Sequence, residues 1–165
     1  MTSPSRTTIR IIACGSPLMG DDAIGLLAAR ALKRHLEGSG VEIVEAGTPG
    51  LSLLNILEDT DAAIILDAIC SGSSPGTLHC FSADNLPARE LFPLSLHQFN
   101  IVDALTLGRL TSPEKLPARI IVLGIEIEDL RPALSVSPAV SAALPNLVQR
   151  VLEVLRELGV NLPEH

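Results

Sequence analysis

Three carboxylates and one histidine stand at positions where they could share a ligand. The adjacent pair Asp21 and Asp22 follows the first apolar run of the chain, Asp67 follows a second run, and His97 begins a later amphipathic segment. Carboxylate oxygens and imidazole nitrogens are ligands of divalent transition metals. Residues that follow the strands of a parallel sheet meet at its carboxyl edge, where open α/β sheets bind ligands. These four residues are therefore the first candidates for a metal or catalytic site.

The turn that carries the acidic pair has the glycine spacing of a phosphate-binding loop, G-x-x-x-x-G, from Gly15 to Gly20. Asp21 and Asp22 stand where that loop places Lys and Ser or Thr, so the turn would repel a phosphate and attract a cation. This pattern favours a metal or a cationic ligand. In the alternative interpretation Asp21 caps the following helix and Asp22 lies in its first turn, because both positions favour negative charge.

Asp67 follows five apolar residues, 62–66, that are typical of a strand covered on both faces. A buried carboxylate without a partner is strongly destabilising, so something must compensate its charge. Backbone N–H groups of the following turn would do so, and a metal shared with Asp22 would do so equally well.

His97 lies between Ser95 and Gln98, which together have the pattern of a helix capping box. In the first turn of a helix the positive end of the dipole keeps an imidazole neutral and able to bind a metal. A plain surface histidine is the alternative. None of the remaining histidines is expected beyond a strand end: His35, His79 and His165.

Two further motifs are not expected to carry chemistry. The segment 72–76 matches G-x-S-x-G, but a nucleophile elbow needs a helix directly after it, and a strand-like segment follows Pro75. Cys14 ends the first apolar run and is interpreted as a small buried residue rather than a nucleophile. The sequence thus favours neither a serine nor a cysteine hydrolase.

Alternating apolar runs and amphipathic segments predict one three-layer α/β domain over residues 1–165, with residues 1–8 as a flexible tail. Its mostly parallel twisted sheet should have about five strands with helices on both faces. Ser137 should cap the last helix, Pro145 should kink or divide it, and Gly159 should end it. The predicted strands are 9–14, 41–46, 62–66, 77–82 and 119–125, and the predicted helices are 23–37, 51–57, 96–107 and 137–158.

Composition narrows the possible partners and location. The chain has 12 basic and 19 acidic residues, a net charge of -7, and only 2% aromatic residues. An acidic surface without stacking platforms argues against binding to nucleic acid or to an anionic membrane. The three cysteines form no C-x-x-C pair, and the N-terminus has no apolar signal region. We therefore expect a protein of the reducing cytoplasm.

Taken in order, the motifs resemble those of the [NiFe]-hydrogenase maturation endopeptidases, and the similarity runs over nearly the whole chain. The chain differs from that family at Ala13 and Ser16, where the family usually reads G-x-G-N, and at Ala23, where it often has Gly. These are residues that shape a loop rather than ligands. The motifs that carry the resemblance are Gly15–Gly25, Gly47–Gly50, Leu66–Ala68, Leu96–Gln98, Leu123–Ile125 and Ser137–Pro138.

The resemblance implies that the protein removes a short C-terminal extension from a hydrogenase large-subunit precursor after nickel has been inserted. It also implies that Asp22, Asp67 and His97 are the nickel-sensing ligands and catalytic residues. Either the enzyme holds a divalent metal that activates a water, or the nickel belongs to the substrate and its docking positions the scissile bond. The family's dependence on nickel-loaded precursor favours the second mechanism. Asp21, or a water held by Asp67, is the candidate for starting the attack.

Two other functions fit the same residues. One is a metal-dependent binding module or chaperone of this fold that recognises a partner without cutting it. The other is a related peptidase that acts on a different precursor.

Overall fold

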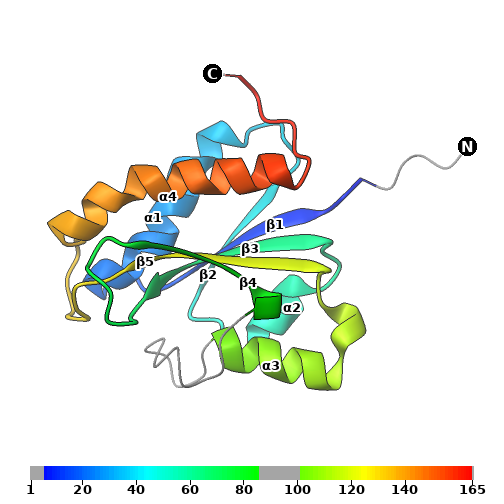
Figure 1. Cartoon of the computed structure of the whole chain (residues 1–165), viewed down its shortest axis with the longest axis horizontal. Coiled ribbons are helices and arrows are strands. Elements are labelled where there is room, and N and C mark those ends of the chain that lie inside the picture. Colours follow the sequence, from blue (N-terminus) through cyan, green and yellow to red (C-terminus); the bar gives the residue numbers. More distant parts are fainter. Residues whose placement is uncertain (1–5, 86–100, 165) are drawn as a thin grey trace, which may run out of the picture.

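The computed structural model describes residues 6–85 and 101–164, in which a five-stranded sheet has the order β2-β1-β3-β5-β4 (Figure 1). Four strands are parallel, and β4 pairs antiparallel with β5 at one edge. The predicted fold class is confirmed, including the short strand at the edge. The strands are β1 Ile9–Cys14, β2 Glu42–Gly47, β3 Ala62–Ile69, β4 Leu78–Ser82 and β5 Arg119–Glu126.

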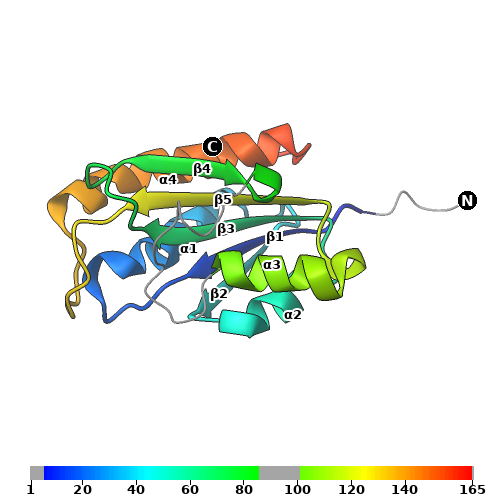
Figure 2. The same cartoon turned by 60° about the horizontal axis from the view of Figure 1, so that its bottom comes forward.

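Helices cover both faces of the sheet, as Figures 1 and 2 show from two directions. Because successive strand residues point to opposite faces, Ile11 and Ile64 pack under α1 and α4, whereas Ile12 and Ile65 pack under α2 and α3. The α-helices are α1 Ile24–His35, α2 Leu53–Leu57, α3 Ile101–Thr111 and α4 Pro138–Glu157, and the short 3-10 helices are η1 Gly20–Ala23, η2 Gly50–Ser52, η3 Ala83–Asn85 and η4 Pro113–Lys115.

Strand β3 is longer than the sequence predicts, and this changes the position of Asp67. The apolar run ends at Leu66, but the strand continues to Ile69 because its last residues pair with the segment 124–126 of β5. Asp67 therefore lies inside the strand rather than after it. Its neighbour in the parallel register is Gly124.

Helix α4 begins after Ser137 and is followed by Gly159, as predicted. Pro145 lies inside one continuous helix of 20 residues, so the expectation that it divides the helix is wrong. Buried residues in the turns on either side, such as Ala143 and Leu147, hold the helix on the sheet across the missing backbone donor. Val160 N–H donates to the Leu155 carbonyl and Gly159 has a φ of 87°, which together close a Schellman motif.

The ends of two other segments also differ from the prediction. The first helix is preceded by the 3-10 turn η1, so Ala23 belongs to that turn. Helix α3 runs to Thr111, four residues beyond the predicted end at 107, and residues 96–100 of the predicted helix lie outside the described part of the chain. Residues 1–5 of the predicted tail are also outside it, while Thr8 N–H donates to Asp61 Oδ2 at 2.7 Å.

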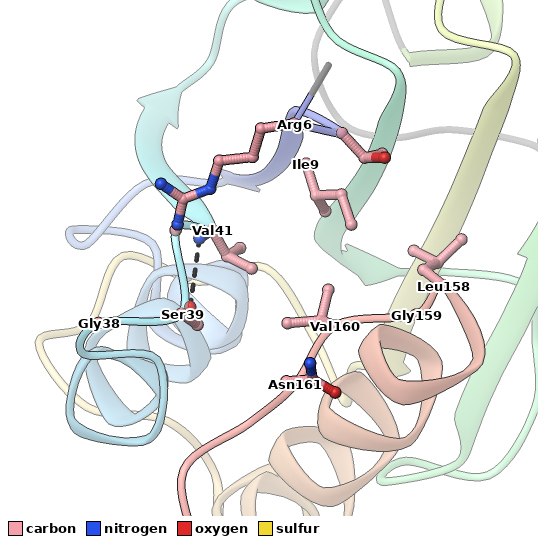
Figure 3. Close-up of a pocket in the computed structure, with 11 residues that line it drawn as sticks. Arg6, Ile9, Gly38, Ser39, Val41, Leu158, Gly159, Val160 and Asn161 are labelled. Carbon is pink, nitrogen blue, oxygen red and sulfur yellow. Dashed lines mark hydrogen bonds between the residues drawn. The ribbon is translucent and has the colours of Figure 1, made fainter. Parts of the chain in front are cut away.

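A pocket of about 400 Å³ opens at the amino end of the sheet (Figure 3). It lies between the first residue of β1, the loop 38–41 and the segment 158–161 after α4, with Arg6 at its rim. Asp22 and Asp67 lie toward the carboxyl ends of the strands, so this pocket does not belong to their site. None of the helices within residues 6–85 and 101–164 combines the length and the apolarity that a bilayer span requires.

Candidate functional site

The fold brings Asp22 and Asp67 to one buried place at the carboxyl edge of the sheet. Asp22 lies in η1 just after β1, and Asp67 lies in β3, the strand next to β1. Both residues are buried. Burial first, and the nearby charge of Asp22 second, raise the pKa of the Asp67 carboxyl to about 7. The two carboxylates predicted to act together are therefore electrostatically coupled.

Each of these carboxylates is held by a backbone N–H group close to it in the chain. Ser16 N–H donates to Asp22 Oδ2 at 2.8 Å, and Ala68 N–H donates to Asp67 Oδ1 at 2.8 Å. Among the residues that the structure describes, no hydrogen bond reaches the second oxygen of Asp67. One N–H group thus compensates Asp67 only in part, and a buried acceptor remains available to a cation or a substrate group.

Two glycines make the close approach of these elements possible. Gly15 has a φ of 124°, and a Cβ there would lie 2.0 Å from the Asp22 carbonyl oxygen. A Cβ on Gly25 would lie 2.7 Å from the carbonyl oxygens of both Cys14 and Leu66. The first turn of α1 therefore rests directly on the end of β1 and on β3 next to Asp67, and this contact sets Asp22 beside Asp67.

Asp21 has a different role from its neighbour. Its carboxylate accepts the Ser137 N–H at 2.6 Å, the Ser137 hydroxyl at 2.9 Å and the Glu128 N–H at 3.1 Å. It makes no capping hydrogen bond to helix α1, so the interpretation of Asp21 as a helix cap is wrong. Ser137 occupies the N-cap position of α4 but directs its hydroxyl to Asp21. This carboxylate ties the loop before α4 to the loop after β1.

Cys14 is the buried end of β1, on the same edge as the two coupled carboxylates. Burial first, and then the charges of Asp67 and Asp22, raise the pKa of its thiol well above the usual value. A thiol in this environment stays protonated at neutral pH and is a poor nucleophile. The interpretation of Cys14 as a small buried residue agrees with this.

The third predicted ligand, His97, lies outside the described residues, and so does the predicted capping box from Ser95 to Gln98. Helix α3, which would follow that box, is described from Ile101 onward. Within residues 6–85 and 101–164, no three His, Cys, Asp or Glu side chains are grouped as metal ligands. The assignment of His97 as a ligand remains a prediction.

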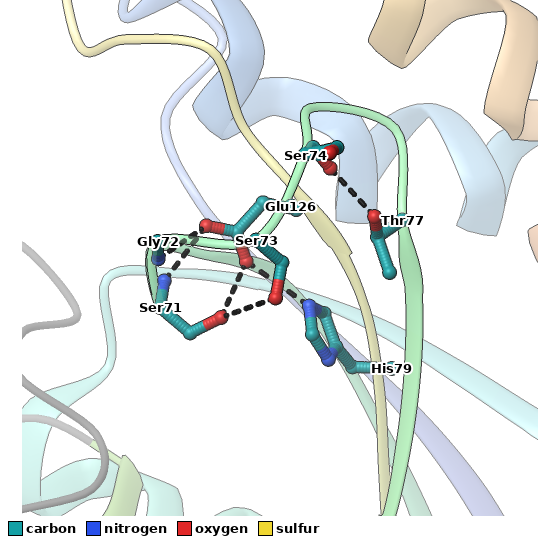
Figure 4. A network of polar contacts seen from close by, with 7 residues as sticks. All are labelled: Ser71, Gly72, Ser73, Ser74, Thr77, His79 and Glu126. Carbon is teal, nitrogen blue, oxygen red and sulfur yellow. Dashed lines mark hydrogen bonds and ion pairs between the residues drawn. The ribbon is translucent and has the colours of Figure 1, made fainter.

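Glu126, the last residue of β5, forms a second buried carboxylate site at this edge (Figure 4). It accepts the N–H groups of Ser71 and Gly72 at 2.8 and 2.9 Å and the Ser71 hydroxyl at 2.8 Å, and His79 Nε2 lies 3.0 Å away. Burial works to raise the pKa of this carboxyl, but these hydrogen bonds together outweigh it and lower the pKa. Glu126 thus fixes the loop between β3 and β4.

The sequence pattern also indicates Glu126, which is not among the predicted site residues. It follows the predicted strand 119–125 as Asp67 follows the predicted strand 62–66, so the same strand-end argument applies to both. His79, which is not expected beyond a strand end, lies on β4 beside this carboxylate. The G-x-S-x-G segment 72–76 is part of the same loop and leads into a strand, which agrees with its rejection as a nucleophile elbow.

Comparison with known proteins links this arrangement to one family. A family model described as hydrogenase maturation protease matches residues 26–154, a stretch that includes Asp67 and begins after Asp22. The chain is 34% identical over 154 residues to the hydrogenase 2 maturation protease of Escherichia coli strain K12, covering 92% of this chain and 93% of that protein.

Two solved structures are similar over nearly their whole length. The hydrogenase maturating endopeptidase HybD from E. coli has a TM-score of 0.81 at 30% identity, over 94% of this chain and 96% of the other. The [NiFe] hydrogenase maturation protease HybD from Thermococcus kodakarensis has a TM-score of 0.72 at 26% identity, over 90% of this chain and 99% of the other.

Proposed function

The chain belongs to the hydrogenase maturation protease family, and from this we propose that it removes the C-terminal extension of a nickel-loaded [NiFe]-hydrogenase large-subunit precursor. The observation that carries the proposal is the coupled pair Asp22 and Asp67, buried together at the carboxyl edge of the sheet. Family membership makes the protein a protease rather than a binding module without activity. A different precursor is the remaining alternative for its substrate.

We propose that Asp22, Asp67 and His97 contact the nickel that the precursor carries. A divalent ion between two coupled carboxylates would remove their repulsion and compensate the burial that raises the pKa of Asp67. The second oxygen of Asp67 has no protein donor within the described residues and is free to take such a contact. Carboxylate oxygens with one imidazole form a mixed donor set that nickel accepts, as do other divalent ions.

Docking on the substrate's metal would then position the scissile peptide at this edge. The attack must start from a water or a side chain that is not already engaged. The Asp21 carboxylate is occupied by Ser137 and Glu128, and the Cys14 thiol stays protonated. These contacts favour a water held by Asp67 over attack assisted by Asp21.

The test is a processing assay on a candidate large-subunit precursor, read by mass spectrometry. We expect the C-terminal mass loss from nickel-loaded precursor and none from the nickel-free form. The variants Asp22→Ala, Asp67→Ala and His97→Ala should each abolish the mass loss and still fold. The control Glu114→Ala changes an exposed carboxylate in η4, near the start of β5, and should cleave normally. Undiminished cleavage by any of the three site variants would remove that residue from the site.

A second experiment separates metal carried by the substrate from metal held by the enzyme. The enzyme is dialysed against a chelator and then mixed with nickel-loaded precursor in buffer without added metal. If the substrate supplies the nickel, cleavage proceeds at the rate of undialysed enzyme. A need to add metal back to the enzyme would instead support a resident ion that activates water.

We also propose a cytoplasmic location. All three cysteines are free in the structure, two of them exposed, which suits a reducing compartment. The net charge of -7 favours a protein partner over nucleic acid or an anionic membrane surface.

A further inference from the structure

Two exposed leucines lie on the two loops that border the Asp22 and Asp67 pair. Leu18, in the loop after β1, is 63% exposed, and Leu134, in the loop before α4, is 88% exposed. The exposed residues Pro17, Pro132 and Ala133 beside them are also apolar, whereas the polar residues Arg131 and Ser135 flank the second loop. We call this surface the apolar lip and define it by its residues: Pro17, Leu18, Pro132, Ala133 and Leu134.

Backbone hydrogen bonds join the two loops into one unit. Ala133 N–H donates to the Leu18 carbonyl at 3.1 Å, and Gly20 N–H donates to the Ala133 carbonyl at 2.9 Å. Met19 and Ala133 form a parallel β-bridge between the segments. Figure 2 shows the loop after β1 and the loop that enters α4 side by side at the same end of the sheet. The two leucines are therefore presented together, although 116 positions separate them in the sequence.

The same loops carry the coupled carboxylate and its supports. Ser16, two residues before Leu18, donates its N–H to Asp22, and Asp21 holds the other loop through Ser137. The lip thus has a fixed position relative to Asp22. A protein that delivers a bound metal or a peptide to Asp22 and Asp67 must pass next to this lip. Apolar groups clustered at such a place mark a protein contact, whereas scattered ones do not.

We propose that the apolar lip is the docking surface for the hydrogenase precursor, and that it binds an apolar segment of the precursor surface beside the metal. This inference rests on the proposed function and adds how the partner is recognised. Burying two exposed leucine side chains contributes to association without any charge. Docking would therefore keep most of its strength at high salt, unlike contacts that depend on the acidic surface.

The test replaces both leucines by serine, which removes the apolar groups without adding charge next to Asp22. For Leu18→Ser/Leu134→Ser we expect the KM for nickel-loaded precursor to rise by about tenfold or more, with kcat nearly unchanged. The matched control is Leu110→Ser. This leucine is 78% exposed in the last turn of α3, which leads through η4 to the amino end of β5. The control should keep the KM of the unmodified protein.

The outcomes separate a failure of the proposed function from a failure of the docking surface. If the unmodified protein does not cleave the precursor, the proposed function fails before the lip is tested. If it cleaves, and the double variant keeps the same KM, the lip is not the docking surface. A fall in kcat alone, or an equal rise in KM for the control, would also overturn the inference.

Discussion

The buried position of Asp67 beside Asp22 lowers the stability of the folded protein. Its pKa is raised from an ordinary value of 3.8 to about 7, because burial and the charge of Asp22 disfavour its ionised form. Between these two values the folded protein holds a proton that the unfolded chain releases. The free energy of unfolding therefore falls as pH rises through this window, and the whole penalty is present above about pH 7.

Asp67→Asn should accordingly make the metal-free protein more stable at pH 8, by about 1–3 kcal/mol, because the amide has no charge to bury. Urea unfolding in the presence of a chelator measures the difference. It should shrink steadily as pH falls and vanish below about pH 4, where both side chains are neutral. The control Asp84→Asn alters an exposed carboxylate and should show no such trend. Equal stability of Asp67→Asn and the unmodified protein at pH 8 would contradict the assignment.

Glu126 affects the pH dependence of stability in the opposite direction, because its hydrogen bonds lower the pKa of its carboxyl below the ordinary value of 4.5. Its contribution to stability is complete above that value and is lost as pH falls through the lower pKa of the folded state. At pH 7, Glu126→Gln should lower the free energy of unfolding by about 2–4 kcal/mol, since an amide cannot accept all of its present donors. Near pH 3 the loss should be much smaller. An unchanged free energy of unfolding of Glu126→Gln at pH 7 would contradict these hydrogen bonds.

At the scale of elements, the contact between α1 and the strand ends decides whether the site forms. Helix propensity alone predicts that alanine at Gly25 would stabilise α1 by about 1 kcal/mol. The structure predicts the reverse, because the new Cβ would meet two strand carbonyl oxygens at 2.7 Å. Backbone atoms of a central sheet cannot move aside cheaply.

Gly25→Ala should therefore destabilise the protein by about 2 kcal/mol or more, measured by urea or thermal unfolding. Gly108→Ala in α3 is the matched control, because its Cβ would meet only the side-chain ends of Leu54 and Leu116. Those methyl groups can rotate, so the control should stay within about 1 kcal/mol of the unmodified protein. A stabilised Gly25→Ala variant would show that α1 is not seated on the strands as described.

At the scale of the whole molecule, Asp21 joins parts of the chain that are far apart in sequence. Its three hydrogen bonds reach Glu128 and Ser137, which are 107 and 116 residues away. They hold the start of the last helix against the loop after the first strand. Hydrogen bonds between the N-terminal and C-terminal parts of the chain thus hold together the edge of the sheet that carries the site.

Removing this tie should have a graded effect. Asp21→Ala loses all three contacts and leaves buried donors unsatisfied, so we expect a loss of about 2–4 kcal/mol. Ser137→Ala removes only the hydroxyl and should lose about 1 kcal/mol. Urea unfolding of both variants gives the comparison. A loss from Ser137→Ala as large as that from Asp21→Ala would contradict the assigned hydrogen bonds.

Much of the fold could be predicted because apolar periodicity is a local property. A run such as 62–66 predicts a buried strand wherever it occurs, and the alternation of runs with amphipathic segments predicts layers of helices around a parallel sheet. The ends of elements were less predictable. Strand β3 continues through Asp67 because β5 supplies hydrogen-bond partners there, which no window around residue 67 contains.

By itself the sequence determined the layered fold and the position of Asp22 and Asp67 at one edge, because strand ends of a parallel sheet meet there. Only the tertiary structure decided how the carboxylates divide their roles. Asp21 and Asp22 are adjacent, yet one accepts donors from Ser137 and the other is coupled to Asp67. Hydrogen bonds and charges act between residues that are distant in the chain, so they leave no periodic signal in the sequence.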